Sequence, residues 1–198
     1  SIDIPDSTIR LDAGAFQKCS SLTTITIGKN VQSIGSAAFN QCSSLTSIHI
    51  PDQVEKVGDD AFRGCSSLVS MTLPSSVTTI GKGAFGNCIS LTSIILSDGI
   101  KEINSAMFRG CTALVSVTLP HSVTKIGYNA FMSCSALTSI TIPNSISYIS
   151  QSAFKGCSSL KEIVCEDPTL FHKEHFDDIS NIQFIVPEPL HNQSSSTP

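Results

Sequence analysis

The sequence predicts an α/β solenoid, a stack of similar coils, because three features of the chain recur every 23 residues. A phenylalanine and a cysteine three positions later recur in seven consecutive copies without insertion or deletion. A short segment of alternating apolar residues recurs with the same period. The phenylalanines are Phe16, Phe39, Phe62, Phe85, Phe108, Phe131 and Phe154, and the cysteines are Cys19, Cys42, Cys65, Cys88, Cys111, Cys134 and Cys157.

Residues 45–50 illustrate the predicted strand of each coil. Ile48 and Ile50 alternate with polar residues, so the two isoleucines share one face of an extended segment. Pro51 ends the strand, because proline has no N–H for the ladder and fixes its own φ. We expect the equivalent strands of neighbouring coils to stack as one parallel sheet.

The rest of each coil is expected to be an extended or irregular return segment and one helical turn. The Ala-Phe-x-x-Cys block is too short for a stable helix and fits a single α or 3₁₀ turn. The predicted shape is an arc with the parallel sheet on the concave face and the helical turns on the convex face. Glycine recurs where a special turn conformation is expected, at Gly35, Gly58, Gly81 and Gly127.

The repeat register predicts where the solenoid ends. It holds over residues 1–165, which we expect to form a single solenoid domain. We expect residues 166–187 to form a degenerate C-terminal cap, as terminal repeats do. Within this cap, residues 169–178 predict one short helix. Residues 184–187 resemble a last strand and its proline, displaced to a 21-residue step.

Charge and hydropathy exclude two classes of partner. Residues 1–160 hold ten Lys/Arg and nine Asp/Glu, whereas residues 161–198 hold two and seven. Without a basic face to neutralise phosphates, we expect no nucleic-acid partner. No apolar run reaches the roughly 18–20 residues that a membrane span needs.

Residues 188–198 contain Ser, Thr and Pro without periodicity, which predicts a flexible tail.

The cysteine column has two interpretations. Stacked coils would place successive Cα atoms about 5 Å apart, which permits disulfides. We favour reduced, packed thiols, because the column continues the apolar columns and buried cysteine behaves as a small hydrophobe. Zinc is disfavoured, because its ligands must converge whereas this column spreads along a line.

A second arrangement of metal-ligating residue types occurs near the C-terminus. His172 and His175 lie three residues apart beside Asp177 and Asp178. A solvated cap helix is the favoured interpretation, and we expect no metal and no cofactor.

The sequence contains no recognisable catalytic constellation. Only five histidines are present, and His49 and His121 occupy exposed template positions in different coils. The glycines recur once per coil as turn residues rather than as a phosphate-binding loop. We therefore expect no enzyme activity.

The template Leu-x-x-Ile-x-Ile-Pro-x-x-Val-x-x-Ile-Gly-x-x-Ala-Phe-x-x-Cys resembles the BspA-like class of leucine-rich repeats over residues 2–165. That class includes surface proteins of trichomonads, Entamoeba, treponemes and Bacteroidetes. Ser-Ser-Leu after the cysteine, as in Ser43-Ser44-Leu45, is most similar to the trichomonad members. The resemblance implies a leucine-rich-repeat arc, an extracellular or cell-surface location, and adhesion to a host or matrix protein. It supplies neither catalytic residues nor the identity of a ligand.

The exposed positions of the predicted strands form the candidate binding surface. His49 and Ile95 interrupt a column of threonines, and Val69 and Val115 replace threonine in a second column. Exposed apolar side chains on a concave sheet can anchor a protein partner. The candidate residues on the strands are Thr26, His49, Val69, Thr72, Ile95, Val115 and Thr118, and those on the rim are Lys29, Asp52, Asp98 and His121.

These features favour a monomeric, non-catalytic protein-binding module that uses its concave sheet. A structural spacer or stalk without a ligand of its own remains an alternative. Ice binding is a more distant one, because regular threonine columns on a flat solenoid can bind ice. The expected curvature and the interruptions at His49 and Ile95 count against it.

Overall fold

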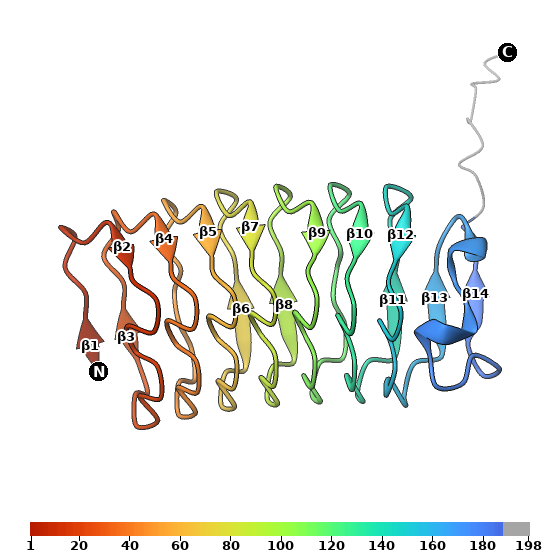
Figure 1. The fold of residues 1–198 in the computed structure, drawn as a ribbon, viewed down its shortest axis with the longest axis horizontal. Helices are drawn as coiled ribbons and strands as arrows, with labels where there is room; N and C mark the ends of the chain where they lie inside the picture. Colours follow the sequence, from red (N-terminus) through yellow and green to blue (C-terminus); the bar gives the residue numbers. More distant parts are fainter. Residues whose placement is uncertain (188–198) are drawn as a thin grey trace, which may run out of the picture.

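The computed structural model describes residues 1–187 as a parallel β-solenoid whose coils follow one another along the long axis (Figure 1). Most coils contribute one short strand to each of two strand columns. The first column contains β1 (Ile2–Asp3), β3 (Ile25–Thr26), β6 (Ser70–Thr72), β8 (Ser93–Ile95), β11 (Ser139–Thr141), β13 (Glu162–Val164) and β14 (Gln183–Ile185). The second contains β2 (Arg10–Leu11), β4 (Ser33–Ile34), β5 (Lys56–Val57), β7 (Thr79–Ile80), β9 (Glu102–Ile103), β10 (Lys125–Ile126) and β12 (Tyr148–Ile149).

The second strand column corrects the prediction of an extended or irregular return segment. Its strands pair in parallel with a 23-residue step, as in Leu11↔Ile34 and Ile34↔Val57. Each strand has only two residues, one exposed or partly exposed and one buried. Two residues are too few for an alternating pattern to stand out in a sequence.

The helical turn expected on the convex face is not observed. Two residues of the Ala-Phe-x-x-Cys region adopt positive φ in each coil, for example Ala37 (55°) and Gln41 (60°). A left-handed residue cannot continue a right-handed helix. The Phe39 N–H instead donates to the carbonyl of Ala61 in the next coil at 2.7 Å. Within residues 1–187 the helices are two 3₁₀ turns, η1 (Pro168–Leu170) and η2 (Lys173–His175).

The recurring glycines are needed for close approach between coils rather than for a left-handed turn. A Cβ added at Gly35 would lie 2.6 Å from the backbone nitrogen of Ala13, and one at Gly127 would lie 2.6 Å from that of Ser105. This approach lets the glycine N–H reach the preceding coil. The Gly35 N–H donates to the carbonyl of Leu11 at 2.8 Å.

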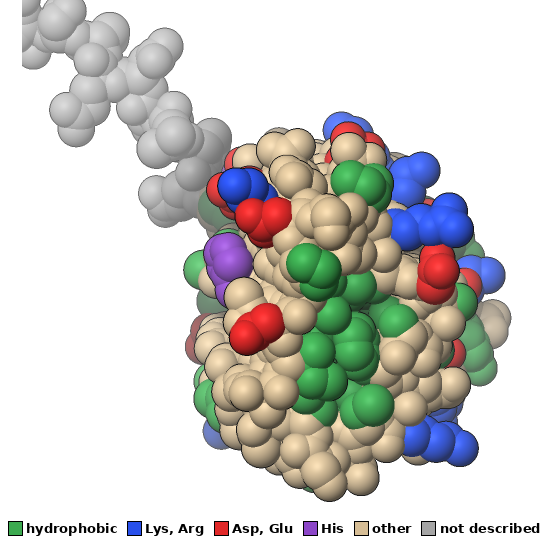
Figure 2. All heavy atoms as spheres, turned by 90° about the vertical axis from the view of Figure 1, so that its left-hand side faces the viewer, with side chains coloured by type: hydrophobic (Ala, Val, Ile, Leu, Met, Phe, Trp, Pro, Cys, Tyr) green, Lys and Arg blue, Asp and Glu red, His purple; other side chains and the backbone are tan. Residues whose placement is uncertain are grey.

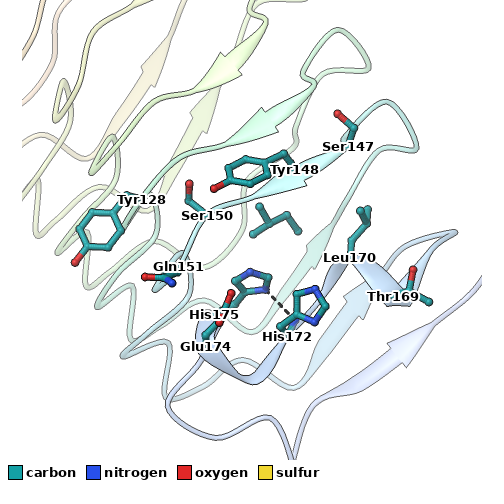
Figure 3. A pocket seen from close by; sticks show the side chains of 11 residues that line it. Tyr128, Ser147, Tyr148, Ser150, Gln151, Thr169, Leu170, His172, Glu174 and His175 are labelled. Atoms are coloured by element: carbon teal, nitrogen blue, oxygen red, sulfur yellow. Dashed lines mark hydrogen bonds between the residues drawn. The ribbon is translucent and has the colours of Figure 1, made fainter.

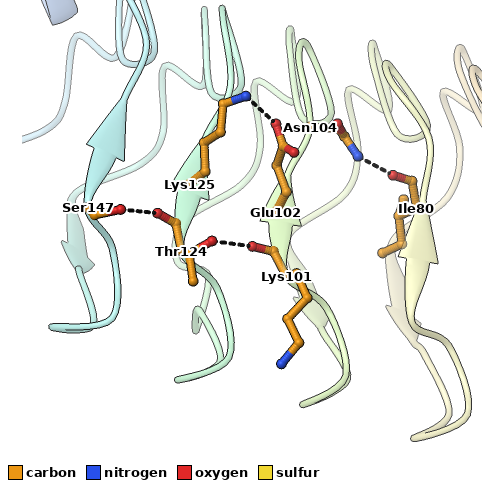
Figure 4. Close-up of polar contacts among 7 residues, drawn as sticks. All are labelled: Ile80, Lys101, Glu102, Asn104, Thr124, Lys125 and Ser147. Atoms are coloured by element: carbon orange, nitrogen blue, oxygen red, sulfur yellow. Dashed lines mark hydrogen bonds and ion pairs between the residues drawn. The ribbon is translucent and has the colours of Figure 1, made fainter.

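Asn104 occupies the same template position in the coil of Phe108 and breaks the pattern (Figure 4). Its side-chain Nδ2, rather than its backbone N–H, donates to the Ile80 carbonyl at 2.7 Å. The second column is interrupted at this point, between β7 and β9. Ser150, which also has a Cβ at this template position, still donates its backbone N–H to the Ile126 carbonyl, at 2.9 Å. The side-chain amide of Asn104, and not the mere presence of a Cβ, therefore accounts for the interruption.

The core is a row of phenylalanines in which each ring packs against its counterpart in the next coil. Successive ring centroids from Phe16 to Phe154 lie 5.3–5.8 Å apart, and the rings are within 15° of parallel. The rings from Phe39 to Phe154 are at most 1% exposed. Each one therefore has an aromatic neighbour on both faces, an arrangement that stabilises beyond simple burial.

The cysteine column lies beside these rings, and all eight cysteines of the chain are free. Each thiol from Cys42 to Cys157 donates to a phenylalanine carbonyl of the preceding coil, as Cys65 Sγ does to the Phe39 oxygen at 3.2 Å. Burial raises the pKa of Cys65 from 9.0 to about 12, and neighbouring Cys42 adds to the shift. The thiols are thus protonated hydrogen-bond donors at neutral pH.

Residues 166–187, which we call the C-terminal segment, continue the stack with different backbone. Phe176 stacks on Phe154 at 5.5 Å and 13°. The expected single helix over residues 169–178 is replaced by η1 and η2. β14 pairs with β13 at a 21-residue step, which confirms the predicted displaced strand. The flexible tail predicted at residues 188–198 lies outside the described residues.

His175 is a buried polar residue of the C-terminal segment, with 1% of its surface exposed. Its Nδ1 accepts a hydrogen bond from the His172 backbone N–H at 3.0 Å. Burial lowers the pKa of His175 from 6.5, and His172 lowers it further. Glu174 and the Ile149 carbonyl partly oppose that shift.

The N-terminal end of the stack exposes apolar side chains. Ile2 and Ile9 are 38% and 52% exposed. Phe16 and Cys19 are only partly buried, unlike their counterparts Phe39 and Cys42 in the next coil. Figure 2 shows hydrophobic side chains gathered in the middle of this end.

Substituting Phe85 by alanine is expected to lower the free energy of unfolding by about 3–5 kcal/mol, because it removes a fully buried ring and leaves a cavity. Thr79→Ala, an exposed change in β7, should shift stability by less than about 0.5 kcal/mol. Urea denaturation of both variants measures the difference. A midpoint for Phe85→Ala equal to that of the parent chain would contradict a core role for the ring.

The thiols other than Cys19 should be nearly unreactive towards a thiol-specific reagent in the native protein at neutral pH, because burial and raised pKa values suppress their thiolates. Cys19, at the partly open end, should react first. Denaturant should release all eight thiols at once. Rapid labelling of several thiols in the folded chain would contradict this prediction.

Acid should loosen the C-terminal segment. The pKa of His175 is lower in the folded state, so its contribution to stability is present above 6.5 and is lost as pH falls towards the folded value. The protection factors of the amides of residues 171–176, which compare each exchange rate with the intrinsic rate at the same pH, should therefore fall between pH 7 and pH 5. His175→Gln, which cannot titrate, should reduce that pH dependence, whereas an unchanged dependence would exclude His175 as its source.

Candidate functional site

All eleven residues of the predicted binding surface are exposed in the structure. Thr26, Thr72 and Ile95 lie on the outer face of strands of the first column, with Thr118 bridged to Ile95 in the same row, and alternate residues point inward, as predicted. Val117, which precedes Thr118, is 6% exposed, and Ile94, which precedes Ile95, is 4% exposed. The rim residues follow the strands at one template position in separate coils.

Ile95 is the most exposed large apolar side chain of the described residues, at 62%. It pairs in register with Thr72 of the preceding coil and bridges to Thr118 of the following one. The structure therefore brings these three predicted residues side by side in one row. Ile95 has a hydroxyl-bearing neighbour on each side, so its apolar surface is not covered by another large side chain of that row.

Val69 and Val115 lie in a parallel row, on either side of Thr92. The Thr92 N–H donates to the Val69 carbonyl at 2.9 Å, and the Val115 N–H donates to the Thr92 carbonyl at 3.3 Å. Both valines are nearly half exposed, at 49% and 47%. The two valines and Ile95 thus occupy three consecutive coils.

Ile89 was missed by the sequence analysis. It is 49% exposed in the same coil as Ile95, at a position where the first three repeats have Ser20, Ser43 and Ser66. That departure from serine was the available signal. We call Val69, Ile89, Ile95 and Val115 the apolar group.

His49 lies where the first strand column is interrupted. The strand predicted at residues 45–50 does not form, although Ile48 and Ile50 are buried and His49 is exposed, as its alternation requires. Within residues 1–187, no backbone hydrogen bond joins residues 47–50 to a neighbouring coil. The expected side-chain alternation therefore persists without the ladder.

A surface recess of about 330 Å³ occupies this interruption. It brings together three predicted residues, His49, Lys29 and Asp52. Ile27, Asn30, Pro51 and Gln53 complete its lining. The structure does not place Asp98 or His121 in this recess.

The charge of Lys29 is already compensated. Its Nζ lies 3.3 Å from Asp6, and its backbone N–H also donates to that carboxylate at 3.0 Å. These hydrogen bonds lower the pKa of Asp6 below 3.8. Because the pair is exposed, it orders this corner more than it stabilises the fold.

The arrangement suits binding rather than catalysis. Thr72, Thr118 and their neighbours offer hydroxyls, and the apolar group offers uncovered hydrocarbon surface. Across residues 1–187, no three His, Cys, Asp or Glu side chains come together in a way that could hold a metal ion. Among the described residues, no helix has the length and apolar character needed to cross a bilayer.

A family model described as BspA type leucine rich repeat region, in six copies, matches residues 1–112 and 78–195 of the chain. No curated protein is significantly similar to the chain.

Solved structures show the same fold. The leucine-rich repeat protein of T. pallidum is 32% identical with a TM-score of 0.77, and the match covers 80% of this chain and 76% of that one. A leucine-rich cell surface protein of Faecalibacterium prausnitzii is 27% identical with a TM-score of 0.63, covering 89% and 62%. A leucine-rich repeat protein of Eubacterium ventriosum is 25% identical with a TM-score of 0.69, covering 88% and 46%.

Proposed function

Because this chain belongs to the BspA-type leucine-rich repeat family, we propose that it is a cell-surface adhesion module that binds a host or extracellular-matrix protein. Proteins of this family are generally non-catalytic and serve as protein-interaction or surface modules. The proposed binding surface is the outer face of the first strand column, and the module acts as a monomer.

The exposure of Ile95 is the observation that carries this proposal. The template residue in its row is threonine, which satisfies the β-strand without placing a hydrocarbon side chain in water. Ile95 exposes 62% of its surface, and the rest of the apolar group lies in the same and adjacent coils. Several uncovered apolar residues in consecutive coils, with threonine and serine hydroxyls beside them, match the apolar centre and polar rim of a protein interface.

The similarity to solved structures supports the proposed cell-surface location. One of them is described as a cell surface protein. A surface protein that displays a rigid sheet can bind without the entropic cost of ordering a loop.

Ile95→Glu should weaken binding to immobilised matrix proteins or host-cell surface proteins by at least about tenfold, since it places a charge in the apolar centre of the interface. Ile95→Thr, which restores the template residue, should weaken binding less and leave the fold unchanged. Surface plasmon resonance with fibrillar matrix proteins and solubilised host membrane proteins provides the measurement.

Thr79→Glu, on the second strand column, is the matched control and should bind as the parent chain does. If Ile95→Glu and Val115→Glu both keep full affinity for every captured partner, the first-column surface is excluded. If the parent chain binds none of these proteins, the spacer interpretation is favoured instead.

A further inference from the structure

A second recess, of about 490 Å³, lies where the last regular coil meets the C-terminal segment (Figure 3). It forms because the second strand column ends at β12. The chain then turns into η1 and η2 instead of adding a strand. A volume of this size falls in the range of small-molecule sites. It is separate from the first-column surface proposed above.

Both tyrosines of the chain line this recess. Tyr128 and Tyr148 are 53% and 52% exposed, although large aromatic rings are normally buried. Other coils place small or charged residues at the same template positions, for example Lys82 in the row of Tyr128 and Lys56 in the row of Tyr148. No requirement of the coil template therefore explains the two exposed rings.

Polar side chains that can both donate and accept hydrogen bonds surround the rings. Figure 3 shows Ser150 and Gln151 on the coil side, and His172, His175 and Glu174 on the side that the C-terminal segment supplies. Such mixed groups suit a ligand that itself carries many donors and acceptors, such as a row of hydroxyls.

His175 adds an unpaired donor to the recess wall. Its Nδ1 accepts from the His172 N–H, so the neutral ring carries its proton on Nε2. Nε2 is buried and has no hydrogen-bond partner with acceptable geometry among the described residues, although the Ile149 carbonyl is nearby. A buried donor without a partner is costly, and an acceptor in the recess would relieve that cost.

The charges around the recess argue against an ionic ligand. Among residues 1–187, no Lys or Arg lines it, whereas the Glu174 carboxylate does. The nearby Lys125 is paired with Glu102 at 3.0 Å. Its Nζ also lies 5.7 Å from the Tyr148 ring centroid, so that ring already has one cation beside it, whose repulsion disfavours a cationic ligand there.

We propose that this recess is a binding site for a neutral oligosaccharide. A pyranose ring presents a flat C–H face, which packs on an aromatic ring, and hydroxyls at its edge, which pair with amide, hydroxyl, carboxylate and imidazole groups. Tyr148 and Tyr128 supply the aromatic faces. Gln151, Ser150, Glu174 and His175 supply the hydrogen bonds.

The chain has no tryptophan and only these two tyrosines, so its intrinsic fluorescence reports on this recess alone. Neutral tetrasaccharides of glucose, of N-acetylglucosamine and of galactose with N-acetylglucosamine should be titrated into the full chain. At least one is expected to change the tyrosine emission saturably. Tyr148→Ala and Gln151→Ala should each weaken that binding by about tenfold or more, measured by calorimetry.

Matched variants separate recognition from folding. Tyr128→Phe and Tyr148→Phe keep the aromatic face and should bind within a few-fold of the parent chain, with unchanged thermal unfolding. Ile95→Glu should leave saccharide binding intact, so failure of this site and failure of the first-column surface are distinguishable. The proposal is overturned if no neutral saccharide binds at millimolar concentration, or if Tyr148→Ala and Gln151→Ala bind as the parent does. It is also overturned if only sialyllactose, choline or a peptide binds.

Discussion

The structure depends on one constraint, that each buried residue packs against its own counterpart in the neighbouring coils. The phenylalanine rings stack face to face at 5.3–5.8 Å, and the cysteine thiols bond to the carbonyls of those same phenylalanines one coil back. A one-residue insertion within a coil would have to bulge out of the packed rows for the residues beyond it to keep their partners. The invariant 23-residue step is therefore a consequence of packing that is shared by the whole stack.

This constraint confines functional variation to the outward positions. Replacing threonine by Ile95 leaves the inward-facing Ile94 undisturbed, because successive strand residues face opposite sides. The same holds for Tyr148 beside the buried Ile149. The two surfaces discussed above use this freedom differently. The first-column surface presents apolar side chains along the regular coils, whereas the recess beside Tyr148 lies where the regular coils end and the C-terminal segment begins.

Much of the scaffold could be predicted from the sequence, because a pattern repeated seven times exceeds chance even when each copy is short. The phenylalanine and cysteine columns and the inward faces of the first strands follow directly from it. The second strand column could not be predicted, since two residues per strand give no periodicity. The turns were mistaken for helix although glycine occupies several of the positions with positive φ, at Gly14, Gly64, Gly83, Gly110 and Gly156. Ala37 and Gln41 occupy the same two positions in another coil, so these glycines do not form an unbroken column. The positive φ of Ala37 and Gln41 is imposed by the backbone bonds between coils.

Part of the candidate site could also be predicted, because the repeat defines the residue expected at each position. Departures from a regular column, such as Ile95 and His49, are visible in the sequence. Ile89 can also be recognised in the sequence, because Ser20, Ser43 and Ser66 occupy its position in the three preceding repeats. The recess beside Tyr148 depends on how the C-terminal segment folds back, which the repeat does not specify. The side-chain bond from Asn104 to Ile80 is likewise a local solution that only coordinates reveal.

The stacking direction also determines how the protein responds to load. Its strands lie across the long axis, so a pull along that axis separates neighbouring coils one after another instead of shearing a whole sheet. Each coil that comes away releases 23 residues, or roughly 80 Å of extended chain. Since the coils are held by nearly the same contacts, they should yield at similar forces. A tethered molecule built in this way would lengthen in even steps under flow, keeping the remaining coils folded and their outward surfaces available.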